Sequence, residues 1–331
     1  MSDQDVRSRG SAIATIVLTL LGWSSIPLFL RYFTDYLDAW TANGWRYAIS
    51  AVLWLPVIVW AYRRDRVPPG LWRAALVPSV FNALGQICFA IAPYMVDPGL
   101  MTFGLRLQIV FAAAGAALLF PIERDLLRRP LFLSGLIVVA MGTLATVALK
   151  PAGFEAKSWL GVVISIASGL FYACYSLSVR KWMSTMNPIV AFAAVSQYTS
   201  AVLVVLMLVL APRAGANVFD LHQTQIVFLV ISSVVGIGLG HTLYFYSLRR
   251  LGVAVSVGVV QLQPFLVSIA SIRLFNEQMR PIQWVTGAVA ICGAGVMLVA
   301  QHRWASAREA KRRADMERAA QTPLADPVAG S

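Results

Sequence analysis

Arginines inside long apolar segments are the first residues of this 331-residue sequence that can do chemistry. Arg106 lies seven residues into an apolar segment that begins at residue 99, and its planar guanidinium group matches the two oxygens of a carboxylate. We expect it to bind an anionic group of a solute. The alternative is that its side chain extends to the nearer end of the segment. For Arg46, in another apolar segment, we expect a structural role, with hydrogen bonds to loop carbonyls.

Amide side chains form two further candidate sites. Asn82 and Gln86 are four residues apart, so a helix places them on one face. Gln261 and Gln263 are two residues apart and face nearly opposite sides of a helix. One of the second pair can therefore line a cavity while the other packs against a neighbour, and the sequence leaves open which one does so.

Two prolines inside apolar segments predict kinks or gating points. Pro264 follows Gln263 and lacks a backbone donor, which frees a carbonyl in the preceding turn. That carbonyl is a candidate acceptor for the ammonium group of a solute, and the alternative is an ordinary packed kink. Pro27 is the second candidate, in the first apolar segment.

Aromatic side chains complete the candidate site. Trp23, Tyr172, Tyr175 and Tyr244 lie at or below the middle of their apolar segments, and His241 precedes Tyr244 by three residues. Trp and Tyr usually occupy the two interfaces of a membrane, so central positions indicate a polar or water-filled cavity. The alternative, for each ring taken alone, is that it fills a contact between helices.

The sequence lacks the groups that catalysis or metal binding would need. No Asp or Glu lies near the middle of an apolar segment, and His241 is the only histidine inside one. The cysteines Cys88, Cys174 and Cys292 are far apart and show no disulfide or metal-binding spacing. No glycine-rich phosphate-binding loop occurs. We therefore expect no cofactor, no metal and no enzymatic activity.

The segments that must position these residues are predicted to be membrane-spanning helices. Hydrophobic residues make up 58% of the chain and charged residues 13%, whereas soluble domains have ~45–50% and ~25%. About 20 apolar residues cross the hydrocarbon core as a helix. The sequence thus predicts an all-α membrane protein with ten transmembrane helices over 11–31, 40–62, 72–94, 99–120, 131–150, 159–180, 188–211, 225–248, 253–275 and 282–301.

The distribution of basic residues predicts the orientation. With the N-terminus inside, nineteen Lys and Arg residues fall on the cytoplasmic side and five on the other. This bias places both termini in the cytoplasm, and it accounts for the net charge of +12 without nucleic-acid binding. A basic tail over 302–331 follows the last span. We expect a short helix over 303–320 and disorder from Thr322 to Ser331.

Two halves of the chain, 1–150 and 151–301, echo one another. Matching features follow in the same order in both: Gly85 and Gly240, Leu107-Gln108 and Leu262-Gln263, Glu123 and Glu277. Five spans per half is an odd number, so the second half must enter the membrane in the opposite direction. Such inverted repeats are typical of alternating-access transporters, whose solute site lies between the repeats at the middle of the membrane.

Several runs of residues resemble a known family. The chain is similar to the second EamA repeat of the drug/metabolite transporter superfamily at Gly236–Gly252 (GIGLGHTLYFYSLRRLG), Gln263-Pro264-Phe265, Asn276-Glu277 and Gly287–Ile291. In the first half, Pro121-Ile122-Glu123 stands where family members often carry Gly-Glu. The runs Gly22-Trp23-Ser24 and Ile87-Cys88 further resemble YddG-type amino-acid exporters.

The resemblance implies a transporter that exports small metabolites by alternating access around a central cavity. It implies amino acids as solutes, including hydrophobic or aromatic ones, and a bacterial inner (plasma) membrane as the location. Because no acidic residue lies at depth, we expect an uncoupled facilitator, which is a monomer or a weak homodimer in the lipid bilayer. The alternative is a multidrug or sugar-nucleotide carrier of the same superfamily, with proton coupling as a further option.

The predicted orientation can be tested with reporter fusions. A reporter fused after residue 66 is expected in the cytoplasm, and one fused after residue 155 on the opposite side, because an odd number of spans separates them. Alkaline phosphatase and green fluorescent protein report the two compartments. Placement of both fusions in the same compartment would contradict the ten-helix arrangement.

Overall fold

The structure is a computed structural model that describes residues 3–149, 156–251 and 253–321. Its described residues form helices and turns without a strand, and ten helical segments are long and apolar enough to cross a membrane. The ten predicted spans are therefore confirmed. Their ends differ from the predicted ones by three residues at most, except that the last helix continues past residue 301.

Six spans are continuous helices, and the longest ends in the tail. The helix predicted for 303–320 is the continuation of the last span, while Thr322 to Ser331 lie outside the described residues. The chain passes through Pro27 in the first span without a break in the helix. The continuous spans are α1 (Asp3–Phe33), α2 (Ala39–Arg63), α7 (Pro130–Ala148), α8 (Ala156–Met183), α9 (Pro188–Leu210) and α14 (Pro281–Gln321).

The other four spans are assembled from shorter pieces. They are α3 (Leu71–Ile91) with η1 (Ala92–Tyr94), α4 (Pro98–Leu105) with α5 (Gln108–Leu119), α10 (Gln223–Ser233) with η4 (Val234–Leu239) and α11 (Gly240–Leu251), and α12 (Val253–Val260) with α13 (Gln263–Phe275). The η4 piece is a wider π-helical turn. Short helices η2 (Pro121–Glu123), α6 (Arg124–Leu127) and η3 (Pro212–Asp220) lie in the connections.

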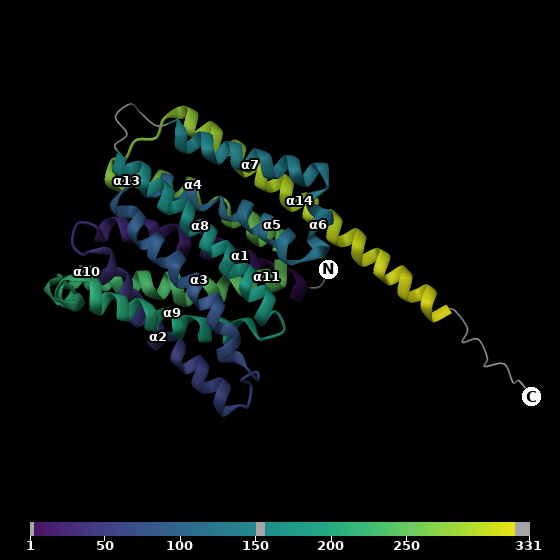
Figure 1. Ribbon diagram of the computed structural model, residues 1–331, viewed down its shortest axis with the longest axis horizontal. Coiled ribbons are helices and arrows are strands. Elements are labelled where there is room, and N and C mark those ends of the chain that lie inside the picture. Colours follow the sequence, from purple (N-terminus) through teal and green to yellow (C-terminus); the bar gives the residue numbers. More distant parts are fainter. Residues whose placement is uncertain (1–2, 150–155, 252, 322–331) are drawn as a thin grey trace, which may run out of the picture.

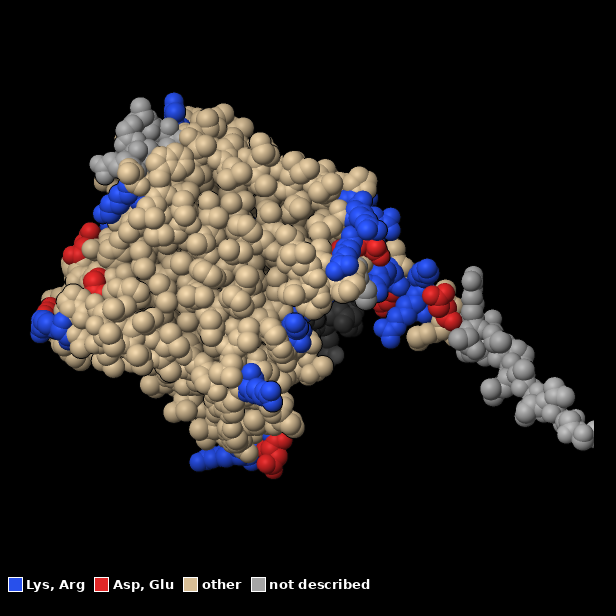
Figure 2. Space-filling view, viewed as in Figure 1, with Lys and Arg blue, Asp and Glu red and all other residues tan. Residues whose placement is uncertain are grey.

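The outer surface of the bundle is apolar. Side chains such as Val52, Leu118 and Val209 are 70%, 76% and 72% exposed, which only a lipid environment makes favourable. Figure 2 shows that Lys, Arg, Asp and Glu gather at the ends of the helices and leave an uncharged band between them. This distribution is the one that a multi-pass membrane protein requires.

Polar side chains close the turns at both ends of the bundle. Asp38 begins α2 by accepting hydrogen bonds from the backbone of Trp40 (2.9 Å) and Thr41 (3.0 Å), and Asn187 does the same for Ile189 (3.0 Å) at the start of α9. These caps satisfy the first backbone donors of the helices, which is why the connections are short. We call the end with turns 34–38 and 276–280 the Arg31 end, and the opposite end the Arg180 end.

The two repeats pack against one another through corresponding spans. α2 lies against α9, α3 against α8, α1 against α11, and α7 against α14. Figure 1 shows α7 and α14 side by side along one edge of the bundle, away from α1. A Cβ at Gly142 would lie 2.8 Å from the backbone of Ala290, so glycine is what lets this pair approach closely. The remaining spans surround the interior that holds the polar residues.

Candidate solute-binding site

The fourth span is broken at its middle. α4 ends at Leu105 and α5 begins at Gln108, so that Arg106 and Leu107 form the turn between them. Around this turn the backbone hydrogen bonds join residues three apart instead of four: Arg106 N donates to Phe103 O at 3.0 Å and Leu107 N to Gly104 O at 3.2 Å. Such a break is tolerated in a membrane only inside protein or beside a water-filled cavity.

The ninth span is broken at the corresponding residues of the second repeat. α12 ends at Val260 and α13 begins at Gln263, with Gln261 and Leu262 between them. Pro264 occupies the first turn of α13, where its missing donor costs no intrahelical bond. The sequence left open whether this proline frees a carbonyl for a solute or makes an ordinary packed kink. In the structure a short turn separates α12 from α13 here, and Pro264 lies at the start of α13.

A chain of hydrogen bonds joins the two breaks to the first span. Arg106 Nη2 donates to Gln263 Oε1, and Gln263 Nε2 donates to the carbonyl of Trp23 at 2.8 Å. The indole Nε1 of Trp23 then donates to the carbonyl of Gly236 at 3.3 Å. Gln263 is thus the amide that connects the spans, while no interaction of the described residues engages the Gln261 side chain, which is 8% exposed.

Aromatic rings surround this chain of bonds. The Trp23 ring lies 4.9 Å from the ring of Tyr244 and 5.4 Å from that of His241. A Cβ at Gly240 would overlap Trp23 Nε1, so the glycine is needed to let the indole approach α11. On its other side His241 stacks on Phe192, with centroids 4.0 Å apart and planes 19° apart. We call Trp23, Arg106, His241, Tyr244 and Gln263 the central site.

Arg106 is a cation held by neutral groups. Its side chain is partly buried, its Nε is covered and has no hydrogen-bond partner in the described part of the chain, and its bonded partner is an amide. Tyr244 interacts with it electrostatically. The side chain points into the bundle toward α13, so the alternative of extension to the end of its segment is wrong.

The remaining predicted residues form a second group at the contact of α3 with α8. The Tyr172 ring lies over Gly85, where a Cβ would be 2.8 Å away, and Ser168 Oγ donates to the Gly85 carbonyl at 2.9 Å. Asn82 Nδ2 donates to Thr199 Oγ1 of α9 at 3.0 Å, while the backbone carbonyl of Gln86 accepts from Asn43. This group packs α3 against α8 and α9.

Arg46 differs from the sequence-based expectation. Its side chain is 2% exposed, and Nε donates to Ser232 Oγ at 3.2 Å instead of to loop carbonyls. Tyr47 and Tyr172 interact with it electrostatically. A Cβ at Gly236 would lie 3.4 Å from Arg46 Nη2, so Arg46 approaches the same π-helical turn as Trp23. The expectation is wrong because a helix face that turns inward carries the guanidinium into the bundle.

An apolar cavity of about 340 Å³ opens beside the central site toward the Arg180 end. Tyr175 lines it, as do Phe192 and Phe245, so that the ring of Phe192 separates the cavity from His241. The sequence analysis found Tyr175 but missed both phenylalanines, because nothing local marks an apolar ring as cavity-lining. We call this the aromatic cavity; its lining is Tyr175, Val179, Met183, Ser184, Met186, Pro188, Ala191, Phe192, Val195 and Phe245.

Comparison with known proteins places the chain in a family. The model of the EamA-like transporter family matches twice, over residues 10–148 and 159–299. The chain therefore belongs to this family of membrane transporters, within the drug/metabolite transporter superfamily. A solved structure titled "Crystal structure of protein" has the same fold, with a TM-score of 0.61 and 16% identity over 88% of this chain and 98% of that one. No curated protein matches.

The two amides at the ninth-span break can be told apart by substitution. Gln263→Ala removes a hydrogen bond to a charged group, worth about 1.5–3 kcal/mol, and is expected to lower transport at limiting solute roughly ten- to a hundredfold. Gln261→Ala breaks no side-chain bond described above and is expected to lower it less than about threefold. Gln86→Ala likewise breaks no side-chain bond described above and is expected to have an equally small effect. Wild-type transport by a well-expressed Gln263→Ala variant would place the site elsewhere.

Proposed function

We propose that this transporter exports amino acids, including hydrophobic and aromatic ones, through alternating access around the central site. The observation that carries the proposal is Arg106: a covered guanidinium at a helix break, bonded to the amide of Gln263 and to no carboxylate of the described spans. A cation in that setting favours an anionic group of the solute as its partner, since an unpaired charge inside a membrane is costly.

The ends of two half-helices support the binding of a carboxylate. α5 and α13 both begin at the breaks, so their N-termini lie at the same level as Arg106. The positive end of a helix dipole attracts an anion, and broken helices in transporters use it in this way. Arg106 adds a fork of donors that matches a carboxylate.

The aromatic rings suit the remaining parts of an amino acid. A solute ammonium group is stabilised over the faces of Trp23 and Tyr244 and by carbonyls at the breaks, without an acidic partner. An apolar or aromatic side chain of the solute fits the aromatic cavity, whose rings Tyr175, Phe192 and Phe245 offer edge and face contacts. According to this proposal, the protein works as a monomer or weak dimer in a bacterial inner membrane.

The aromatic cavity also favours a second candidate, an apolar drug. Such a solute would use the cavity and leave Arg106 unused. Flux into proteoliposomes of the purified protein distinguishes the two candidates. Labelled leucine, phenylalanine and glutamate test the amino-acid exporter, and a lipophilic cation tests the drug carrier. We expect saturable uptake of the amino acids, lowered at least about tenfold in Arg106→Gln. Transport of the lipophilic cation alone, unaffected by Arg106→Gln, would favour the drug carrier.

Energy coupling depends on which groups can titrate inside the membrane. Proton-coupled carriers need a group that titrates inside the membrane, and the middle of the described spans holds no Asp or Glu. His241 lies between Trp23 and Phe192 and serves on this account as an aromatic partner. We therefore propose a facilitator that moves amino acids down their own gradient.

Coupling is tested by imposing a pH gradient on the same proteoliposomes. Wild-type protein is expected to equilibrate the amino acid without accumulating it, with less than about a twofold effect of the gradient. Uptake by His241→Ala is expected to respond to the gradient no more than wild type does. Accumulation against the solute gradient that depends on pH and disappears in His241→Ala would identify His241 as a coupling residue.

A further inference from the structure

In the part of the chain that the structure describes, an ion pair joins the two repeats at each end of the bundle. At the Arg31 end, Arg31 Nε lies 3.8 Å from Glu277 Oε1; at the Arg180 end, Arg180 Nη2 lies 2.7 Å from Glu123 Oε1. Both carboxylates are largely buried, with side chains 11% and 13% exposed. The pairs Arg213–Asp220 and Arg313–Glu309, in contrast, are 60% exposed or more at every member. Salt and water screen the first two pairs far less.

The two pairs occupy corresponding positions of the inverted repeats. Arg31 lies eight residues beyond Trp23, and Arg180 lies eight residues beyond Tyr172, the ring that covers the corresponding glycine. The aromatic partners correspond as well. The guanidinium of Arg31 lies 5.3 Å from the ring of Phe275, and that of Arg180 lies 4.2 Å from the ring of Phe120. The same arginine, phenylalanine and glutamate unit therefore occurs once at each end.

Each unit connects moving parts of different repeats. Arg31 ends α1 of the first repeat, and Glu277 follows α13, the outer half of the broken ninth span. Arg180 lies near the end of α8 of the second repeat, and Glu123 follows α5, the outer half of the broken fourth span. A tilt of either half-helix away from α1 or α8 separates the charges. Val179, the neighbour of Arg180, lines the aromatic cavity.

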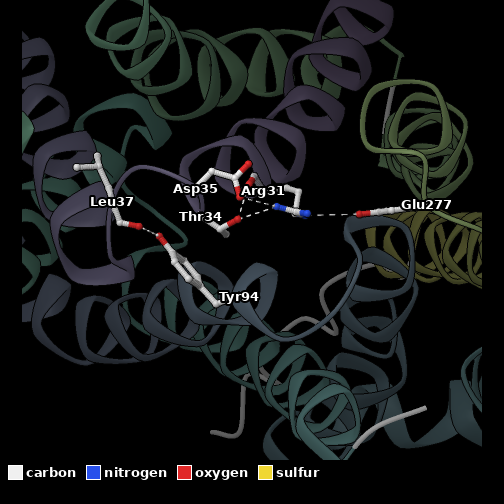
Figure 3. A network of polar contacts seen from close by, with 6 residues as sticks. All are labelled: Arg31, Thr34, Asp35, Leu37, Tyr94 and Glu277. Carbon is white, nitrogen blue, oxygen red and sulfur yellow. Dashed lines mark hydrogen bonds and ion pairs between the residues drawn. The ribbon is translucent and has the colours of Figure 1, made fainter. Parts of the chain in front are cut away.

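The Arg31 unit has a second acid within reach. Figure 3 shows Arg31 between Glu277 and the turn that follows α1, where its Nη1 lies 2.8 Å from Thr34 Oγ1 and 3.4 Å from Asp35 Oδ1. Asp35 is 63% exposed and belongs to the same repeat as Arg31. When Glu277 moves away, Arg31 keeps a partner, which limits the cost of opening.

We infer that Arg31–Glu277 and Arg180–Glu123 are the two gates of the transporter, each of which must break for its end to open while the other holds. Both pairs are within ion-pair distance in this structure. Opening at both ends at once would break both ion pairs, which costs more than breaking one. The interior therefore opens to one side at a time, as alternating access requires. The inference rests on the transporter family and not on the proposed solute, so a failure of the amino-acid proposal leaves it standing.

Cysteine labelling from each side tests the inference without any solute. The native cysteines are first replaced, and one reporter is added: Val195→Cys in the aromatic cavity or Leu100→Cys beneath the Arg31 end, positions that are 1% and 5% exposed. A membrane-impermeant maleimide is applied to either side of oriented vesicles. Glu123→Gln removes one gate and Glu277→Gln removes the other. Glu309→Gln, which breaks an exposed pair in the tail, is the matched control.

Opposite changes at the two ends are the expected result. Glu123→Gln is expected to raise labelling of Val195→Cys about five- to tenfold and to lower that of Leu100→Cys, and Glu277→Gln to do the reverse, because each shifts a two-state equilibrium. The exchanged pair Glu123→Arg with Arg180→Glu is expected to return the labelling of both reporters to the wild-type level. Glu309→Gln is expected to change neither reporter.

Three outcomes would overturn the inference. Labelling that rises at both ends together indicates a loosened bundle and no gate. Unchanged labelling in a variant that melts as the wild type does shows that the pair holds nothing closed, and so does failure of the exchanged pair to restore it. If Glu123→Gln does not fold, Arg180→Gln removes the same pair from its more exposed member and must give the same shift.

Discussion

Hydrocarbon offers no hydrogen bonds to the backbone, and this constraint determines where the structure can be irregular. Every peptide group within the membrane must be paired inside the protein, so a spanning helix is normally continuous. The chain departs from this at the Arg106–Leu107 turn, the Gln261–Leu262 turn and the π-helical turn η4. All three lie next to one another through the bonds that join Arg106, Gln263 and Trp23 to Gly236. The irregular backbone therefore locates the central site without reference to any family.

The inverted repeat gives this interior its two-sided character. Corresponding rings cover corresponding glycines, Trp23 over Gly240 and Tyr172 over Gly85, and each first helix of a repeat ends in an arginine that meets a glutamate of the other repeat. The correspondence fails at two arginines inside the spans of the first repeat: Gln261 stands where Arg106 does, and Gln197 stands where Arg46 does (Arg46-Tyr47 against Gln197-Tyr198). A symmetric scaffold with unmatched cations in one repeat can open to either side and still bind an anion at a single point, and Arg106 is the cation bonded to Gln263 at the two breaks.

Much of the architecture could be predicted from the sequence, because lipid makes hydropathy a direct measure of position. Ten spans follow from segment length and the repeat from residues such as Leu107-Gln108 and Leu262-Gln263. The polar residues near the middle of the membrane also follow from their positions within these segments. Which helices pack against each other, however, could not be predicted from local patterns. Nothing around Asn82 or Gln86 indicates that their face meets α8 and α9, and nothing around Phe192 indicates that it stacks on His241.

The same reasoning applies to two individual residues. Pro264 predicts the loss of one backbone hydrogen bond, but whether the helix bends or restarts there depends on what the freed groups meet in the neighbouring spans. Arg46 was predicted to reach loop carbonyls from its depth alone, whereas its direction depends on the rotation of α2 about its axis, which is set by packing against α9 and α10. The depth of a side chain in the membrane can be predicted from the sequence. The direction in which it points around the helix axis cannot, unless the neighbouring helix is known.

The central claim is that Arg106 at the broken fourth span binds the solute. Equilibrium binding of labelled amino acids to the purified protein in detergent tests this most directly, since it needs neither a gradient nor a working gate. The account predicts saturable binding that weakens roughly ten- to a hundredfold in Arg106→Gln and stays within about twofold of wild type in Arg273→Gln, an exposed arginine near the end of α13. Equal affinity of wild type and Arg106→Gln for every amino acid that binds would contradict it.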